Sequence, residues 1–136
     1  MNREILFRGK RWDNGKWATG DLLQYQDGRT EIHSYVEGCR QADEVDHRTI
    51  GQYTGLQDKT GVKIFEGDIL RFRNLYDEEY ETAAVVWYGE SGYTAFDLKE
   101  HQFECNGLAY IVQSGDYEYK VIGNIHDNPE LLEVTP

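Results

Sequence analysis

The residues that could carry covalent or metal chemistry are few and widely spaced. The chain has two cysteines and four histidines, namely Cys39, Cys105, His33, His47, His101 and His126. Neither His101-x3-Cys105 nor Cys39-x7-His47 matches the close ligand pairs of structural zinc sites. The residues around the two thiols show no group that would activate a nucleophile. We therefore expect no catalytic residue, no metal and no cofactor, and we expect the protein not to be an enzyme.

An acidic run, Tyr76-Asp77-Glu78-Glu79-Tyr80-Glu81, is the densest group of carboxylates. It lacks the alternating ligands and central glycine of an EF-hand loop, and the chain contains no glycine-rich phosphate loop or dinucleotide fingerprint. Across the chain, 25 acidic residues against 14 basic ones give a net charge of −11. The run is either a solvated loop or, at residues 76–80, part of a surface that contacts a partner protein.

The N-terminal segment has the opposite charge. Residues 1–17 contain five basic and two acidic residues, and the basic side chains alternate with tryptophans. The candidate surface here consists of Arg8, Lys10, Arg11, Trp12 and Trp17. Basic and aromatic side chains together are typical of nucleic-acid binding, although the acidic remainder of the chain disfavours a general affinity for phosphate backbones.

Turn residues at short intervals predict an all-β fold. The Asn14-Gly15 dipeptide favours a type I′ hairpin, which would pair Asp13 with Lys16 and Trp12 with Trp17. Residues 50–72 also read as strand, turn and strand repeatedly. Further β-branched and aromatic runs predict strands at 17–25, 30–36, 62–65, 68–73, 82–88, 93–98, 108–112 and 117–125.

The pattern within these strands indicates how they are buried. Leu70 and Phe72 share one face of their strand while Arg71 and Arg73 share the other, which predicts a half-exposed strand. Short, strongly bent strands favour small sheets of the SH3-like barrel or β-sandwich type, with an N-terminal β-hairpin.

Helix is predicted only as short pieces. Residues 98–104 could form about two turns of helix. Near the C-terminus, Asn128 is a suitable N-cap and Pro129 a suitable first helical residue, so a short helical turn is expected there.

Three ordered blocks carry a family resemblance. The opening, residues 3–17 followed by Gly20-Asp21-Leu22-Leu23, the central residues 50–69, and the ending, residues 121–132, resemble the YopX family. The resemblance implies a β-rich protein encoded by bacteriophages and prophages, and it supplies no established activity or catalytic residue. The glycines and turn residues in these blocks are expected to serve turns, caps and close packing.

The resemblance and the length of 136 residues predict a single YopX-like domain over 1–136, possibly with two lobes, about 1–60 and 61–136, that share one core. The N-terminus lacks the apolar run of a signal peptide and no segment could span a bilayer. We therefore expect a soluble protein with free thiols in the cytoplasm of a bacterial host and no membrane partner.

Two functions remain open from the sequence. The first is a non-enzymatic interaction module that binds a host or phage protein, or assembles with itself, because 18 aromatic residues, ten of them tyrosine, suit contact surfaces. The alternative is a nucleic-acid-associated accessory protein that uses the basic N-terminal segment.

Overall fold

The computed structural model describes residues 3–89, 95–100 and 107–133. The chain divides into two compact units, Met1–Gly55 and Leu56–Pro136. Within the described residues both units consist mainly of antiparallel strands, with one short α-helix and two 3-10 turns. The predicted all-β class is confirmed, and the prediction of a single domain with a division near residue 60 stays a prediction.

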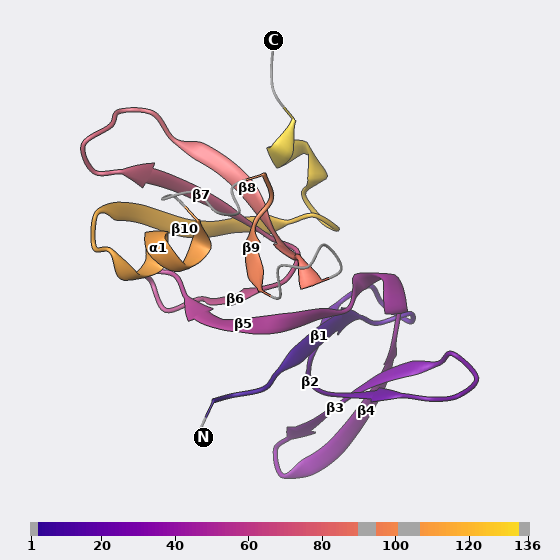
Figure 1. Cartoon of the computed structure of the whole chain (residues 1–136). Helices are drawn as coiled ribbons and strands as arrows, with labels where there is room; N and C mark the ends of the chain where they lie inside the picture. The colour runs from indigo at the N-terminus through magenta and orange to yellow at the C-terminus, as the bar shows by residue number, and fades with distance from the viewer. Residues whose placement is uncertain (1–2, 90–94, 101–106, 134–136) are drawn as a thin grey trace. The chain divides into compact units, whose positions relative to one another are not determined.

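The first unit is one coiled antiparallel sheet (Figure 1). Its elements are β1 (Phe7–Lys10), β2 (Trp17–Gln24), β3 (Thr30–Val36), β4 (Cys39–Val45), the 3-10 turn η1 (His47–Thr49) and β5 (Gly51–Gln57). The strands follow the order β4-β3-β2-β1-β5. Ala18, Ile32 and Val45 form its small core.

The sheet bends sharply in the middle of β2. Residues 17–20 of β2 pair with β1, whereas residues 21–24 pair with β3. The change of partner occurs at Gly20, where a Cβ atom would overlap the carbonyl oxygen of His33. Glycine in a strand commonly marks such a close backbone approach, so the strong bend depends on the absence of a side chain at this position.

This bend brings the end of β1 toward the end of β4 without closing a barrel. Arg11, which follows β1, forms one isolated antiparallel bridge with Val45. The described strands therefore form open sheets, and the SH3-like barrel alternative is wrong.

The N-terminal hairpin is confirmed, but its predicted register is wrong. Lys10 pairs with Trp17, and the amide of Arg11 donates to the carbonyl of Lys16 at 2.9 Å. Gly15 has a φ of 69°, while Asn14 is not among the described residues of positive φ. The loop is therefore longer than a type I′ turn, and Trp12 lies within it instead of facing Trp17.

A type I′ turn occurs two hairpins later, between β3 and β4. Val36 pairs with Cys39 across Glu37 and Gly38, whose φ angles are 52° and 81°. The left-handed conformation at both positions is what this turn requires. Strand β4 that follows it is mostly exposed and polar, which explains why the sequence pattern did not reveal it.

The second unit contains β6 (Lys63–Phe65), β7 (Asp68–Asn74), β8 (Glu81–Trp87), β9 (Phe96–Leu98), α1 (Leu108–Gln113), β10 (Tyr117–Asn124) and the 3-10 turn η3 (Pro129–Leu132). Its sheet has the order β10-β7-β8-β9. The last residues of β5 also belong to this unit, where β6 is their neighbour. The buried core comprises Ile64, Leu70, Phe72, Ala83, Val85, Leu98, Leu108, Ile111 and Tyr117.

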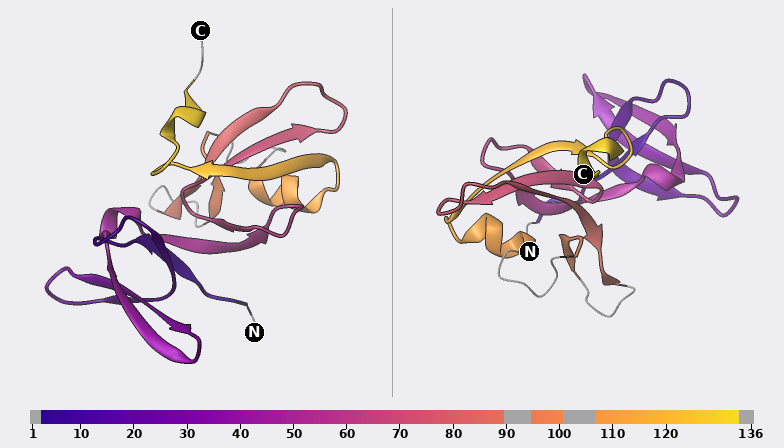
Figure 2. Two further views of the ribbon diagram at one scale, coloured as in Figure 1. Left: turned by 180° about the vertical axis from the view of Figure 1, so that it is seen from behind. Right: turned by 90° about the horizontal axis from the view of Figure 1, so that it is seen from above.

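Helix α1 occupies residues that the sequence predicted to be a strand. Leu108 and Ile111, one helical turn apart, are both buried in the core, and α1 packs against β9 and β10 (Figure 2). The Asp97 carboxylate, which comes from β9, accepts a hydrogen bond from the Leu108 amide at 2.8 Å. The Leu108 amide has no acceptor within the helix, and the side chain of a residue from another element supplies one. The strand prediction at 108–112 was wrong because this contact is tertiary.

Predictions for the remaining short helices have mixed outcomes. The C-terminal turn is confirmed as η3, with Pro129 at its start. The Asn128 side chain does not cap it, and its Oδ1 instead accepts from the amide of Asn124. The helix predicted at 98–104 is wrong at its start, because Leu98 lies in β9, and residues 101–104 lie outside the described residues. Among the described helices none is long and apolar enough to cross a membrane.

We expect Gly20→Ala to destabilise the first unit by about 2–3 kcal/mol, because the added methyl group must displace backbone at the bend of β2. Chemical denaturation followed by tryptophan fluorescence measures the effect. Thr19→Ala, at the exposed neighbouring position, is the control and should cost less than about 1 kcal/mol. Equal stability of Gly20→Ala and the wild type would contradict the proposed cause of the bend.

Candidate functional site

A buried carboxylate fixes the position of the turn between β5 and β6. Oδ1 of Asp58 accepts hydrogen bonds from the Thr60 amide at 2.9 Å, the Thr60 hydroxyl at 2.7 Å and the Val62 amide at 3.0 Å. Its other oxygen, Oδ2, accepts from the amide of Val121 at 3.1 Å. Asp58 is only 5% exposed. Its side chain therefore ties the turn to β10, which lies 63 residues later in the sequence.

These hydrogen bonds keep Asp58 charged. Burial alone raises the pKa of Asp58, but the hydrogen bonds from Thr60, Val121 and Val62 outweigh it and hold the pKa below the usual value of 3.8. Hydrogen bonds donated to a carboxylate stabilise its charged form. The turn and β10 are thus joined by an ionised, well-satisfied group.

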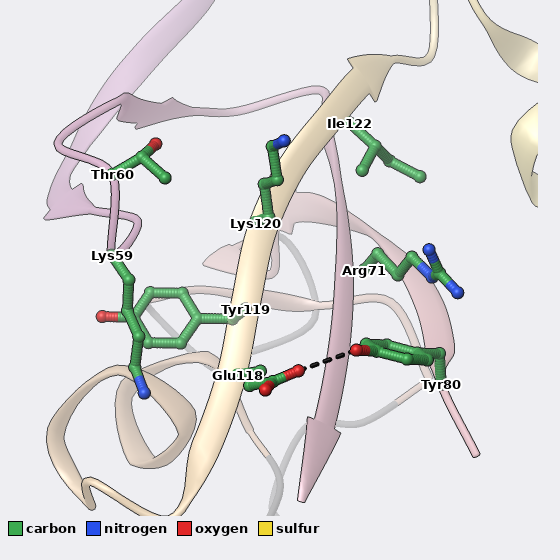
Figure 3. Close-up of a pocket in the computed structure, with 8 residues that line it drawn as sticks. All are labelled: Lys59, Thr60, Arg71, Tyr80, Glu118, Tyr119, Lys120 and Ile122. Carbon is green, nitrogen blue, oxygen red and sulfur yellow. Dashed lines mark hydrogen bonds between the residues drawn. The ribbon is translucent and has the colours of Figure 1, made fainter. Parts of the chain in front are cut away.

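The turn and the sheet together line an open hollow of about 360 Å³, which we call the β10 groove (Figure 3). Its lining residues are Lys59, Thr60, Arg71, Tyr80, Glu118, Tyr119, Lys120 and Ile122. All of them belong to the second unit. The groove combines three cations with two tyrosines, one hydroxyl, one aliphatic side chain and one carboxylate.

Two of the cations lie on tyrosine rings. The guanidinium of Arg71 is 3.9 Å from the centre of the Tyr80 ring, and the Nζ of Lys59 is 5.8 Å from that of Tyr119. The third cation, Lys120, is the cross-strand partner of Arg71. Within the described part of the chain, none of these three forms a salt bridge, although cation–π contacts orient the first two.

The single carboxylate of the groove is already bound. Glu118 accepts a hydrogen bond from the Tyr80 hydroxyl at 2.7 Å and forms a salt bridge with Arg73 at 3.0 Å. These two contacts, that of Tyr80 first, lower the pKa of Glu118. Its negative charge is thus directed toward Arg73 and Tyr80.

Tyr119, on the other side of the groove, keeps its phenol proton. Burial, followed by the nearby charge of Asp58, raises the pKa of Tyr119. Its hydroxyl group therefore stays neutral at physiological pH.

The acidic run that the sequence singled out is divided in the structure. Tyr80 turns into the β10 groove, whereas Asp77, Glu78 and Glu79 line a different hollow, of about 310 Å³, together with Glu81. Tyr76 is 85% exposed. The structure therefore places Tyr80 apart from the carboxylates with which it was grouped.

The basic N-terminal residues are also divided. The guanidinium of Arg8 and the Nζ of Lys10 lie 4.6 Å and 5.8 Å from the ring centre of Trp17. By contrast, Arg11 is bound to Asp13 at 2.7 Å and lies 3.5 Å from Asp43.

Trp12 belongs with Arg11 and not with Trp17. It is 56% exposed and lines a shallow hollow with Arg11 and three acidic residues, Asp13, Asp43 and Glu44. The five residues predicted as one surface thus form two surfaces. Cations accompany the ring in both, since the guanidinium of Arg48 lies 5.9 Å from the ring centre of Trp12, but the Trp12 surface also has carboxylates in its hollow.

Sequence reasoning did not identify Lys59, Arg71 or Lys120 as site residues. The alternation in residues 69–73 did place Arg71 on an exposed face, which the structure confirms. The pairing of β7 with β10 and the attachment of the turn at Asp58 bring the cations together, and neither leaves a local signal.

The structure describes only some of the cysteines and histidines that could carry chemistry. Cys39 is exposed, while Cys105 and His101 lie outside the described residues. In the described ranges no three His, Cys, Asp or Glu side chains are arranged to hold a metal ion.

Comparison with protein families shows what the chain is related to. The sequence model described as "YopX protein" matches residues 6–133, nearly the whole chain. The chain belongs to the YopX family. A comparison with curated proteins found no match.

A solved structure resembles this YopX-family chain along nearly its whole length. The crystal structure of protein EF1440 from Enterococcus faecalis is 25% identical in sequence, with a TM-score of 0.58. The match covers 97% of this chain and 100% of EF1440. The arrangement of strands described above is thus similar to that of EF1440.

Two glycines in the family blocks of this YopX-family chain serve the backbone structure. Gly67 has a φ of 92° beside Asp68, whose carboxylate accepts from the Phe65 amide at 2.7 Å. Such a left-handed turn favours glycine. At Gly123, a Cβ atom would crowd the side chain of Asn128, so this glycine serves close packing.

We expect Asp58→Asn to destabilise the second unit by about 1–3 kcal/mol at neutral pH, because an amide cannot accept all the hydrogen bonds that the carboxylate accepts. The folded-state pKa of Asp58 lies below its usual 3.8. Its stabilising effect should therefore be complete above about pH 4 and disappear as the pH falls through the folded-state pKa.

Chemical denaturation of wild type and variant across this pH range tests the expectation. The difference between the two unfolding free energies should shrink toward acid pH. Asp27→Asn is the control, because Asp27 accepts from the Arg29 amide in an exposed turn and its loss should cost less than about 1 kcal/mol. A pH-independent difference for Asp58→Asn would contradict the assigned charge.

We expect Tyr80→Phe to raise the pKa of Glu118 toward its usual 4.5, because the substitution removes the phenol that hydrogen-bonds the carboxylate and retains the ring. NMR titration of the Glu118 carboxyl carbon measures the shift. Tyr76→Phe, an exposed tyrosine in the same loop, should leave this pKa unchanged. An unshifted Glu118 in Tyr80→Phe would refute the hydrogen bond.

Proposed function

We propose that this YopX-family chain is a non-enzymatic protein-binding module, made from a phage or prophage genome in the bacterial cytoplasm, and that it binds a host or phage protein through the β10 groove. The observation that supports the proposal is the groove itself, where the guanidinium of Arg71 lies on the exposed ring of Tyr80 and the ammonium of Lys59 lies near the half-buried ring of Tyr119. Tyrosine and arginine are enriched where proteins contact one another.

The rigidity of the groove favours binding. The Asp58 carboxylate holds Lys59 and Thr60 against β10, while the buried Leu70 and Phe72 anchor the strand that carries Arg71. Groups that are already ordered lose little conformational freedom when a partner binds.

The openness of the groove favours a macromolecular partner. Its side chains line the surface of a sheet and a turn, and they do not enclose a deep cavity such as those that bury most of a small ligand. The mixed apolar and charged lining suits the side chains of another protein.

The nucleic-acid alternative stays a prediction with a narrower basis. Arg8 and Lys10 on the Trp17 ring form the surface that would carry it. Arg11 contributes little, because its charge is compensated by Asp13 and Asp43.

Affinity capture with matched variants tests the proposed function. The wild type, the double variant Lys59→Gln/Lys120→Gln and the control Lys99→Gln are immobilised and exposed to host lysate. Lys99 is an exposed lysine of the same unit that is not part of the groove. We expect at least one protein to be retained by the wild type and by the control and to be lost with the double variant.

Two outcomes would overturn the proposal. Identical retained proteins for all three forms would show that the groove binds no partner. A concentration-dependent dimer in sedimentation that the double variant abolishes, with no host protein retained, would make the groove an interface between copies of the chain.

A further inference from the structure

We infer that the β10 groove binds a short acidic peptide segment of its partner, in which carboxylates flank an apolar or aromatic side chain. The inference rests on the proposed function and specifies the chemistry of the partner.

The β10 groove differs in charge from the chain as a whole. The chain carries a net charge of −11, yet the groove brings Lys59, Arg71 and Lys120 together around one carboxylate. That carboxylate, Glu118, is bound by Arg73 and Tyr80. The groove is therefore a positive site on a negative molecule, and an anionic group is its complement.

The groove cations differ from other arginines of the chain in their partners. Arg11, Arg48 and Arg73 each form a salt bridge with a carboxylate. In the described part of the chain, Lys59 and Arg71 instead contact ring faces. A ring face accepts no conventional hydrogen bond from the ammonium or guanidinium N–H groups, so these groups remain available to oxygen acceptors. Carboxylates would supply such acceptors.

The three cations are distributed across β10. Arg71 and Lys120 are cross-strand partners, while Lys59 extends from the turn that Asp58 attaches to the opposite edge of β10. In Figure 3, Lys59 and Arg71 lie on opposite sides of this strand. Two carboxylates, one on each side of β10, match this arrangement, so a segment with at least two acidic residues fits best.

Apolar surface accompanies the charges in the groove. The Tyr119 ring and Ile122 belong to the lining, as does Tyr80, which is 43% exposed. An apolar or aromatic side chain between the acidic residues would cover these groups and gain the free energy of burial. The groove thus favours a mixed acidic and apolar sequence over a free anion.

A nucleic acid is a poorer complement than a short acidic peptide. The carboxylates Asp77, Glu78, Glu79 and Glu81 line another hollow of the same unit. A phosphate backbone that extends beyond the groove would be repelled by the net negative surface, whereas a peptide can place a few charges on the groove alone.

Fluorescence anisotropy with defined probes tests the inference. The probe is a labelled octapeptide with three glutamates on each side of a tyrosine pair, and its control has glutamine at each glutamate position. The proteins are the wild type, Lys59→Gln/Lys120→Gln and Lys99→Gln, each with its fold verified by circular dichroism.

We expect the wild type and Lys99→Gln to bind the acidic peptide equally and the double variant to bind it about tenfold more weakly, which corresponds to about 1.4 kcal/mol. The glutamine peptide should bind the wild type at least about tenfold more weakly than the acidic one. Added salt should lower the affinity of the protein for the acidic peptide more than its affinity for the neutral peptide.

Four results would overturn the inference. They are no binding of the acidic peptide, equal binding of both peptides, unchanged affinity in the double variant, and stronger competition by inorganic phosphate or a ten-nucleotide thymidine strand than by unlabelled peptide. The capture experiment distinguishes a wrong peptide chemistry from a wrong proposed function. If capture depends on the groove and the peptide result is negative, only the acidic chemistry is wrong.

Discussion

The buried Asp58 carboxylate is the constraint on which the candidate site depends. It accepts hydrogen bonds from its own turn and from Val121 in β10. It joins the turn that carries Lys59 and Thr60 to the strand that carries Lys120. One ionised group therefore determines both the local turn and the geometry of a surface assembled from distant segments. The many donors that it satisfies offset the cost of burying its charge.

The contacts of the charged groups make this surface positive and partly aromatic. Glu118, the single carboxylate among the residues that line the groove, forms a salt bridge with Arg73, and the charge of Lys59 contributes less to the lowering of its pKa than Tyr80 and Arg73 do. Tyr80 contributes twice, since its hydroxyl group binds Glu118 and its ring lies against Arg71. A strongly acidic chain thus presents a positive, partly aromatic surface. Composition alone, which reports the excess of acidic residues, gives no indication of it.

A comparable dependence on backbone geometry governs the first unit. Gly20 permits β2 to exchange β1 for β3 as its partner, and this bend brings Arg11 to Val45. Arg11 lies beside Asp43, whereas Arg8 and Lys10 lie near the Trp17 ring. Successive side chains of a strand point to opposite faces, and this alternation accounts for the electrostatic division of the N-terminal segment.

The sequence by itself determined the features that depend on neighbouring residues. Alternation in residues 69–73 identified the buried face of β7, turn residues located most strands, Pro129 marked the start of η3, and three sequence blocks indicated the YopX family. Only the tertiary structure decided the features that depend on distant partners. Packing of Leu108 and Ile111 in the core and the Leu108–Asp97 hydrogen bond accompany the helix at residues 108–113. Trp12 lies in a loop that is longer than the predicted turn. The pairing of β7 with β10 and the Asp58 contact bring Lys59, Arg71 and Lys120 together. The physical reason is that side-chain periodicity records which face of a strand is buried, whereas strand register and buried hydrogen bonds are set between segments whose separation in sequence carries no local signal.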